Sequence, residues 1–219
     1  MSVSPVSHTS HDAVCRDSGA SAANATGRPR TTFVLGGARS GKSRFAEEVI
    51  ATLAATSDAI TYIATSAVVP GDAAFAERIA LHRARRPAAW GLIEADHDLA
   101  GALRAADTGP DAIVLIDCLT LWLTRLLCPM DADAPRADWQ TCLSDFHDAL
   151  TQSRGRIVLV SNEIGLGVIP MGALTRLFVD EMGRLNQRVA AACDRVVLTV
   201  AGLPLELKGG AVHSPATNR

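Results

Sequence analysis

A glycine-rich loop that contains a lysine, "GGARSGKS" at residues 36–43, restricts the fold of this chain more than any other feature. An apolar run, "TTFVLGG", leads into it, and a helical pattern over about residues 42–54 follows. The loop fits G-x-x-x-x-G-K-[ST], in which glycines let backbone N–H groups turn toward a phosphate, the lysine reaches the outer phosphates and the serine hydroxyl ligates Mg²⁺. We therefore expect a nucleoside triphosphate to be held by Gly36, Gly37, Ala38, Arg39, Ser40, Gly41, Lys42 and Ser43.

The rest of the chain alternates short apolar runs with longer helical patterns. We expect further strands at residues 59–66, 112–117, 156–163 and 195–202, and a short return strand after a turn at 202–204. Helices are expected at about residues 42–54, 71–86, 96–106, 119–128, 137–153 and 173–192. Near-continuous apolar strands separated by helices predict a mostly parallel sheet covered on both faces. The predicted fold is a P-loop NTPase-like (RecA-like) α/β domain with a C-terminal antiparallel edge hairpin.

Composition separates one domain from two tails. Residues 1–30 are rich in Ser, Ala and Thr without an apolar period, so we expect a disordered extension there. The domain is expected to span residues 31–208, and 209–219 to form a flexible tail. A net charge of −2 gives no electrostatic case for binding nucleic acid or an anionic membrane. The longest apolar stretch is interrupted by Asp117 and Arg125, so no membrane span is expected.

The cysteines indicate a reducing compartment. The chain has five, they are scattered, and no two form C-x-x-C. This pattern argues against both a disulfide framework and a zinc site. We therefore expect a cytoplasmic protein.

An aspartate ends the third predicted strand. Ligands of open α/β sheets bind beyond the carboxyl ends of the strands. Asp117 is in that position, where it is expected to hold Mg²⁺ together with Ser43. The alternative is that Asp117 only caps or turns the chain before the next helix. Thr120 is also a candidate cap for that helix.

A histidine lies in a basic helical segment, "AERIALHRARRPAAW". Arg78, Arg85 and Arg86 fall three or four residues from His82, so a helix brings them around it. Neighbouring cations keep an imidazole neutral, and a neutral imidazole is a nucleophile. Taken alone, the residues favour the simpler interpretation of a solvated basic helix face.

Six segments together resemble one family. They are "GGARSGKS", "YIATS", "RIALHRARRP", "LIDCLTLWLTRLL", "VSNEIGLGVIP" and "GRLNQRVAAACDRVVLTVAGLPLELK". In this order, over about residues 32–208, the chain resembles the bifunctional adenosylcobinamide kinase / adenosylcobinamide-phosphate guanylyltransferases of cobalamin biosynthesis. The resemblance implies Mg²⁺-dependent phosphorylation of adenosylcobinamide by ATP or GTP, followed by GMP transfer from GTP to give adenosylcobinamide-GDP. It also implies a homo-oligomer, specifically a trimer.

The resemblance assigns roles to residues outside the loop. His82 matches the histidine that forms the covalent GMP intermediate, which makes it catalytic together with Lys42. Glu94 matches the acidic residue that contacts the guanosine. The remaining nucleotide contacts implied are Thr65, Ser66, Ala67, Arg83, Ala84, Arg85 and Arg86.

Other interpretations remain open at this point. A GTPase switch is disfavoured because no N-K-x-D motif is present. A small-molecule kinase without guanylyl transfer, or a nucleotide-dependent regulatory module, is compatible with the loop alone. Asn162 and Glu163 lie at the carboxyl end of the fourth strand and either orient the acceptor hydroxyl or build a turn. Arg184 and Arg188 share a helix face, and an interface or surface ion pair there is favoured over a phosphate contact.

Overall fold

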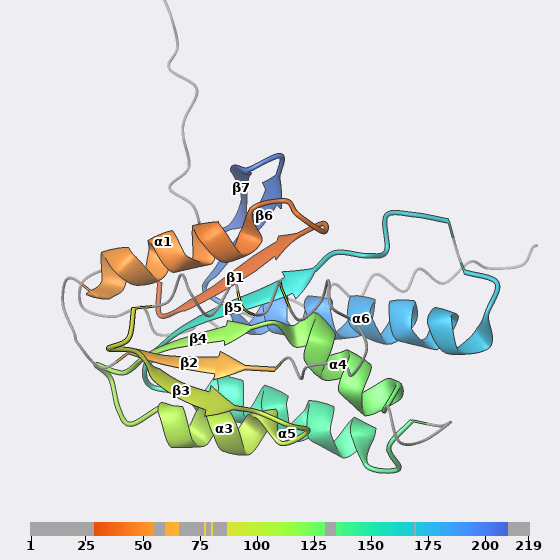
Figure 1. Ribbon diagram of the computed structural model, residues 1–219, viewed down its shortest axis with the longest axis horizontal. Helices are drawn as coiled ribbons and strands as arrows, with labels where there is room; N and C mark the ends of the chain where they lie inside the picture. Colours follow the sequence, from red (N-terminus) through yellow and green to blue (C-terminus); the bar gives the residue numbers. More distant parts are fainter. Residues whose placement is uncertain are drawn as a thin grey trace, which may run out of the picture.

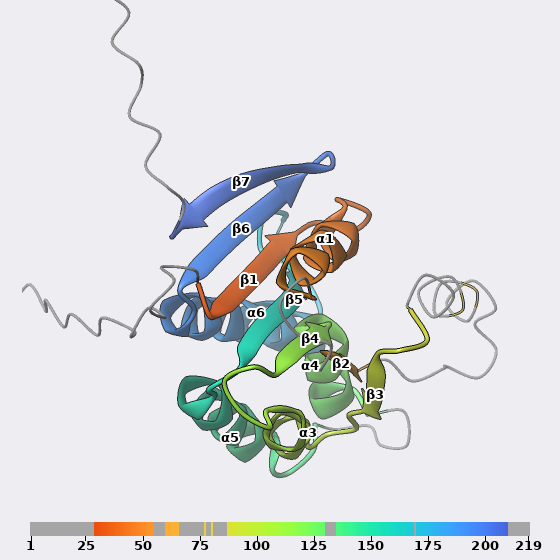
Figure 2. The same ribbon diagram turned by 90° about the vertical axis from the view of Figure 1, so that its left-hand side faces the viewer.

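The computed structural model describes residues 29–54, 60–65, 77, 80, 87–129, 135–168 and 170–209. In these residues helices cover both faces of a single seven-stranded sheet (Figures 1 and 2). The strands are β1 (Thr31–Gly36), β2 (Ile60–Ala64), β3 (Gly91–Glu94), β4 (Ile113–Asp117), β5 (Arg156–Asn162), β6 (Arg195–Val200) and β7 (Leu203–Lys208). The helices are α1 (Lys42–Ala54), α3 (Leu99–Ala106), α4 (Leu119–Leu127), α5 (Trp139–Gln152) and α6 (Ala173–Ala192).

The strand order is β3-β2-β4-β5-β1-β6-β7. All neighbours pair in parallel except β6 and β7, which are antiparallel. Because the six strands β1 to β6 run parallel to one another, their carboxyl ends lie together at one end of the sheet (Figure 1). This confirms the predicted parallel sheet with a C-terminal edge hairpin, and it places the ends of β1, β5 and β4 side by side.

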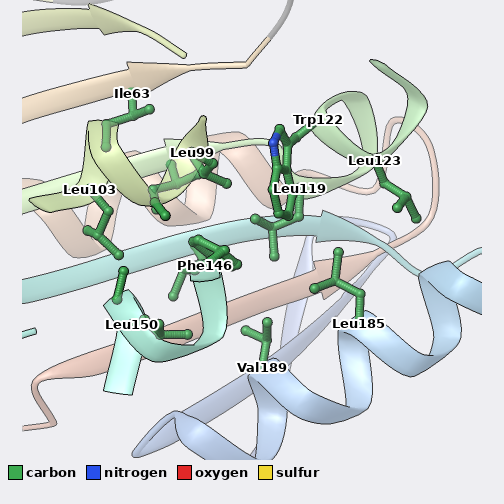
Figure 3. Packing of buried hydrophobic residues seen from close by; sticks show 14 of the residues in the cluster. Ile63, Leu99, Leu103, Leu119, Trp122, Leu123, Phe146, Leu150, Leu185 and Val189 are labelled. Carbon is green, nitrogen blue, oxygen red and sulfur yellow. The ribbon is translucent and has the colours of Figure 1, made fainter. Parts of the chain in front are cut away.

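Two apolar layers hold the sheet between the helices. Val34, Leu115 and Val160 face one side, where they pack with Ile50 and Leu53 of α1. The alternate strand residues face the other side and pack against α3, α4, α5 and α6. Trp122 of α4 and Phe146 of α5 meet edge to face there, with ring centroids 5.1 Å apart (Figure 3). Alternation of apolar residues on both faces explains why the strands have almost continuously apolar sequences.

Most predicted boundaries agree with the structure, and the exceptions have local causes. Helix α1 spans the expected residues 42–54 and α6 the expected 173–192. Helix α3 begins at Leu99, three residues later than expected, because the Asp98 carboxylate caps it by accepting from Gly101 N at 2.7 Å. Strand β3 was not predicted, since it is only four residues long and half-exposed at the sheet edge. The hairpin turn lies at Ala201–Gly202, slightly before the predicted 202–204.

The ends of the domain are tied to each other. Arg30 N and Thr31 N both donate to Asp194 Oδ2, at 2.8 and 3.1 Å. Lys208 Nζ donates to the carbonyls of Ala190 and Ala191, at 3.1 and 2.9 Å, so β7 is fastened to the end of α6. Residues 1–28 of the predicted extension, residues 210–219 of the predicted tail and most of the predicted helix 71–86 lie outside the described residues. Among the described helices, none has the length and apolar character needed to cross a membrane.

Candidate active site

The glycine-rich loop leaves β1 at Gly36 and enters α1 at Lys42. Arg39 and Gly41 have left-handed backbones, with φ of 57° and 96°, which curl the chain back so that Ser40 N donates to Gly37 O at 3.3 Å. Gly36 must be a glycine, because a Cβ there would lie 2.5 Å from both Ser40 Oγ and Thr199 Oγ1. A curled loop at a helix N-terminus directs backbone N–H groups and the positive end of the helix dipole toward a bound anion.

Lys42 is held across this loop. Its Nζ donates to Gly37 O at 2.7 Å, and only 9% of the residue is exposed. Burial lowers the pKa of Lys42 below its ordinary value, and the nearby Cys118 and Asp117 partly oppose that shift. The Lys42 ammonium thus lies across the loop, in a position suited to binding the outer phosphates of a nucleotide.

Asp117 ends β4. The next residue, Cys118, is held by hydrogen bonds to both its backbone N–H and its backbone carbonyl. The hydroxyl of Thr65, a fully buried residue, accepts from Cys118 N at 2.8 Å and donates to Cys118 O at 2.7 Å. The N-cap position of α4 is Cys118, which makes no side-chain cap bond, so the chain does not use Asp117 as the cap. The buried thiol of Cys118 has its pKa raised to about 12 by burial and by Asp117, so it stays protonated beside that carboxylate.

The donor set fits Mg²⁺. Asp117 and Ser43 contribute a carboxylate and a hydroxyl, the oxygen ligands that Mg²⁺ prefers. Asp117 lies near enough to Lys42 to oppose part of the lowering that burial causes in the pKa of that lysine. Thus the glycine-rich loop and the carboxyl end of β4 lie beside the same volume, where the phosphates of a nucleotide and their Mg²⁺ would bind.

Thr120 is not the cap that the sequence predicts. It lies inside α4, and its hydroxyl accepts from Asn162 N at 2.8 Å. The Thr120 hydroxyl is thus hydrogen-bonded to the end of β5, and it is not used to cap the start of α4.

The hairpin formed by β6 and β7 packs against the glycine-rich loop. The sequence pattern does not predict this contact. Thr199 Oγ1 donates to Leu35 O at 3.0 Å and lies 2.9 Å from Ser40 Oγ. Gly202 N donates to Ser40 O at 2.9 Å. A threonine in the otherwise apolar run "VVLTV" is the only local sign of this contact.

Replacing Thr199 with valine is expected to raise the KM for nucleotide roughly fivefold, because Ser40 Oγ and Leu35 O lose a buried partner worth about 1 kcal/mol. Thr199→Ser retains the hydroxyl and should restore the wild-type KM. Steady-state kinetics with varied ATP checks both variants. An unchanged KM in Thr199→Val would contradict a role of the hairpin in shaping the loop.

The remaining candidate residues divide into two groups. Glu94 ends β3, which β2 separates from β4, so it lies toward the sheet edge away from the loop. His82, Ser66, Ala67 and the segment Arg83–Arg86 lie outside the described residues.

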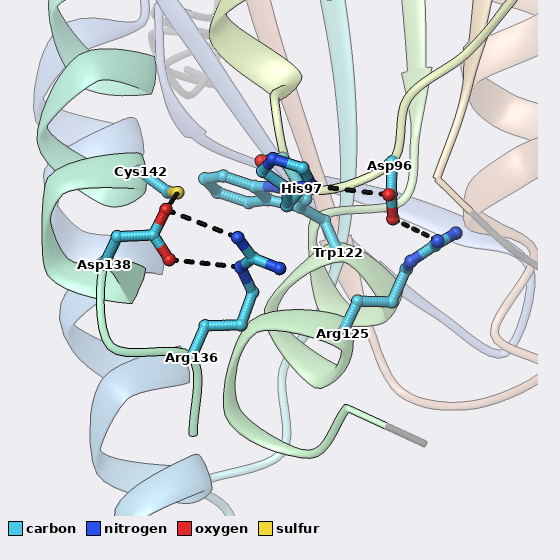
Figure 4. A network of polar contacts seen from close by, with 7 residues as sticks. All are labelled: Asp96, His97, Trp122, Arg125, Arg136, Asp138 and Cys142. Atoms are coloured by element: carbon cyan, nitrogen blue, oxygen red, sulfur yellow. Dashed lines mark hydrogen bonds and ion pairs between the residues drawn. The ribbon is translucent and has the colours of Figure 1, made fainter. Parts of the chain in front are cut away.

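A polar network holds the segment that follows Glu94 (Figure 4). Asp96 forms an ion pair with Arg125, and its Oδ2 lies 3.3 Å from His97 Nδ1, within hydrogen-bond distance. Trp122 Nε1 donates to His97 O at 2.9 Å, which ties the segment to the core. The position of Glu94 is thus supported from α4 as well as from β2.

Two groups of exposed apolar side chains stand out among the described residues. Leu166, Val168 and Met171 follow β5 and are 85%, 97% and 94% exposed. Leu203, Leu205 and Leu207 alternate along β7 and are also exposed. The first group follows Glu163, whose N–H donates to Gly36 O at 3.1 Å, by three to eight residues.

Comparison with known proteins agrees with this geometry. The family model described as "Cobinamide kinase / cobinamide phosphate guanyltransferase" matches residues 32–207. The "Bifunctional adenosylcobalamin biosynthesis protein CobP" of Pseudomonas aeruginosa is 51% identical over 182 residues, which cover 81% of this chain and 96% of that protein. The corresponding CobU protein of Salmonella typhimurium is 38% identical over 185 residues, covering 80% of this chain and 98% of that protein. The similarity therefore extends from β1 into β7.

Proposed function

Because the chain belongs to the cobinamide kinase / cobinamide phosphate guanyltransferase family, we propose that it makes adenosylcobinamide-GDP in two steps. It first phosphorylates adenosylcobinamide with ATP or GTP and then transfers GMP from a second GTP. The observation that carries this proposal is the loop with its buried Lys42, facing Asp117, in a chain that matches the family model over residues 32–207.

In the first step the hydroxyl of the corrinoid's aminopropanol arm attacks the γ-phosphorus, the bond to the β–γ bridging oxygen breaks, and the nucleoside diphosphate leaves. Lys42 and the loop N–H groups bind the phosphates and stabilise the charge that develops on them. Ser43 and Asp117 would hold Mg²⁺, which neutralises phosphate charge when bound. The hydroxyl proton passes to water.

In the second step a nitrogen of His82 attacks the α-phosphorus of GTP, pyrophosphate leaves, and GMP remains as a phosphoramidate. The phosphate of the cobinamide phosphate then attacks that phosphorus and His82 departs. Arg83–Arg86, Ser66, Ala67 and Glu94 are proposed nucleotide contacts on the basis of the resemblance, whereas Thr65 is fully buried and bonded to the backbone of Cys118 and is therefore not proposed as one.

A double-label experiment tests both steps. Purified protein is incubated with Mg²⁺, cobinamide, ATP labelled at the γ-phosphate and GTP labelled at the α-phosphate. We expect both labels in one corrinoid product. Transfer of the γ-label alone would favour a simple kinase, and transfer of neither label would favour a regulatory module.

The acceptor is a large macrocycle, and we propose that the apolar side chains of Leu166, Val168 and Met171 contact it. They are exposed, and they follow by three to eight residues Glu163, whose N–H donates to Gly36 O of the loop. Replacing Val168 and Met171 with serine should raise the KM for cobinamide roughly 100-fold or more and leave the KM for ATP unchanged, since each side chain contributes about 1.5–3 kcal/mol when its apolar surface is fully covered and about 1.4 kcal/mol is a factor of ten.

Leu92→Ser is the matched control for that prediction, because Leu92 is 51% exposed on the edge strand β3 and belongs to neither group of exposed apolar side chains. An unchanged KM for cobinamide in the double variant would contradict the contact. A change in oligomeric state instead would assign the three side chains to a subunit interface.

We also propose that the protein is a cytoplasmic homo-oligomer, and a trimer by family resemblance. The exposed leucines of β7 support self-association, because large exposed apolar surfaces mark interaction sites. The four described cysteines are free thiols, which supports a reducing compartment. Sedimentation of wild type and of a Leu203→Ser/Leu205→Ser variant tests the assembly.

A further inference from the structure

Asn162 lies at the end of the sheet where the carboxyl ends of the parallel strands come together. It ends β5, the strand between β1 with its phosphate loop and β4 with Asp117. Its Cα is paired with Gly36, the first residue of the loop motif. The following residue, Glu163, donates its N–H to Gly36 O at 3.1 Å. Asn162 therefore lies between the residues proposed to bind phosphate and metal.

Side chains from two helices hold the backbone of Asn162. Thr120 Oγ1 of α4 accepts from Asn162 N at 2.8 Å, and Asn186 Nδ2 of α6 donates to Asn162 O at 3.1 Å. Ser161 Oγ donates to Asn186 Oδ1 at 2.9 Å and lies 3.5 Å from Thr120 Oγ1. The bonds thus form a closed network around one strand end.

The network is buried and internally satisfied. Asn186 is 4% exposed, Ser161 is fully buried and Thr120 is 7% exposed. Burying polar side chains in an apolar core is costly unless they are fully paired, and paired networks then specify one arrangement. This one fixes both backbone polar groups of Asn162 without engaging its carboxamide, for which no hydrogen bond to another described residue is found.

The neighbouring carboxylate is less available. Glu163 Oε1 accepts from Gly165 N at 3.0 Å, so it closes its own loop. Of the two polar side chains at the end of β5, Asn162 and Glu163, that of Asn162 is the one left free to meet a ligand within the described part of the chain.

We propose that Asn162 is a further catalytic residue of the phosphoryl-transfer step and that Asn186 is its positioning residue. The inference rests on the proposed kinase activity. The Nδ2 of Asn162 donates to an oxygen of the transferred phosphoryl group, while Oδ1 accepts from the attacking hydroxyl and so aligns it with the γ-phosphorus. The new O–P bond forms as the bond to the bridging oxygen breaks; Asn162 takes up no proton, which goes to water.

The test measures phosphoryl transfer from γ-labelled ATP to cobinamide. Asn162→Ala should lower kcat roughly 10- to 100-fold with little change in the KM for ATP, as expected for loss of hydrogen bonds to a charged transition state. Asn162→Asp keeps the shape but removes the donor and adds a negative charge, so its kcat should fall at least as far. It serves as the readout if the alanine variant does not fold.

A double-mutant cycle tests the positioning role. If Asn186 acts through Asn162, Asn186→Ala should lower kcat on its own but add little to Asn162→Ala. A merely structural role would instead give additive losses or a change in the KM for ATP. Thr124→Val is the matched control, because the Thr124 hydroxyl bonds only within α4, to Thr120 O at 2.9 Å, and its loss should leave kcat unchanged.

The possible failures are distinguishable. No phosphoryl transfer by the wild type would overturn the proposed function itself. An active wild type with unchanged kcat in both Asn162 variants would overturn only the role of Asn162, and additive losses in the cycle only that of Asn186.

Discussion

Replacing His82 with alanine is expected to abolish attachment of GMP to the protein while phosphoryl transfer to cobinamide continues. The variant lacks the nucleophile for the α-phosphorus, and removing a nucleophile costs at least about 10³-fold in rate. The phosphate loop, which performs the first step, is a separate part of the chain at residues 36–43. The measurement uses GTP labelled at the α-phosphate with Mg²⁺, followed by denaturation and counting of protein-bound label. Label that is labile to acid and stable to alkali identifies a phosphoramidate.

His97→Ala is the matched control for that labelling. His97 is also near an arginine, but it pairs with Asp96 and is fixed to the core through Trp122. Its loss should leave the label in place. Label that persists in His82→Ala would assign the intermediate to another residue. A wild type that takes up no label but transfers the γ-phosphate would leave the simple-kinase alternative.

Local pattern is sufficient to predict much of this fold. The glycine-rich loop predicts the strand before it and the helix after it, because the three form one continuous stretch of chain. The apolar run at 112–117 predicts a buried strand for the same reason, and β4 occupies residues 113–117. In each case the physical cause of the element lies within its own residues.

The features that local pattern does not predict depend on contacts between distant residues. Thr199 contacts Ser40 across 159 positions in the chain, and only the placement of β6 beside β1 brings them together. Asn186 reaches Ser161 because α6 packs under the end of β5. Thr120 has the position of a helix cap in the sequence, yet its hydroxyl is bonded to Asn162 at the end of β5. Polar residues of this kind take their role from strand order, which a single sequence does not encode locally.

The two lysines of the chain illustrate the same division. Both Nζ atoms donate to backbone carbonyls, Lys42 to Gly37 O and Lys208 to the end of α6. Only Lys42 is buried, at the end of the sheet where the carboxyl ends of the parallel strands lie, whereas Lys208 is exposed. The glycine-rich motif around Lys42 is local, so it alone distinguishes the lysine that is predicted to bind phosphate from the lysine that fastens β7 to α6.

Lys42→Met is expected to lower phosphoryl transfer roughly 10²- to 10³-fold, because the variant loses a cation directed at the phosphates. It should also lose the stabilisation by nucleotide, which reaches about 2.7 kcal/mol for wild type at 100 times the Kd. Thermal unfolding with and without Mg²⁺ and ATP measures the second effect, and the γ-label assay measures the first. Lys208→Met is the matched control and should retain both activity and the response to nucleotide.

Without nucleotide, Lys42→Met should unfold with a free energy equal to or above that of wild type. Burial lowers the pKa of Lys42 below 10.5 in the folded protein, so at neutral pH the folded state carries a charge that the unfolded chain carries more easily. As the pH rises from the lowered folded pKa toward 10.5, the unfolded chain binds more protons, and wild type should gain stability that the methionine variant does not gain. Denaturant unfolding across neutral and alkaline pH checks this difference. A nucleotide-free variant less stable than wild type at neutral pH would mean that the bond to Gly37 O outweighs the cost of burial, and that Lys42 supports the fold of the loop as well as its chemistry.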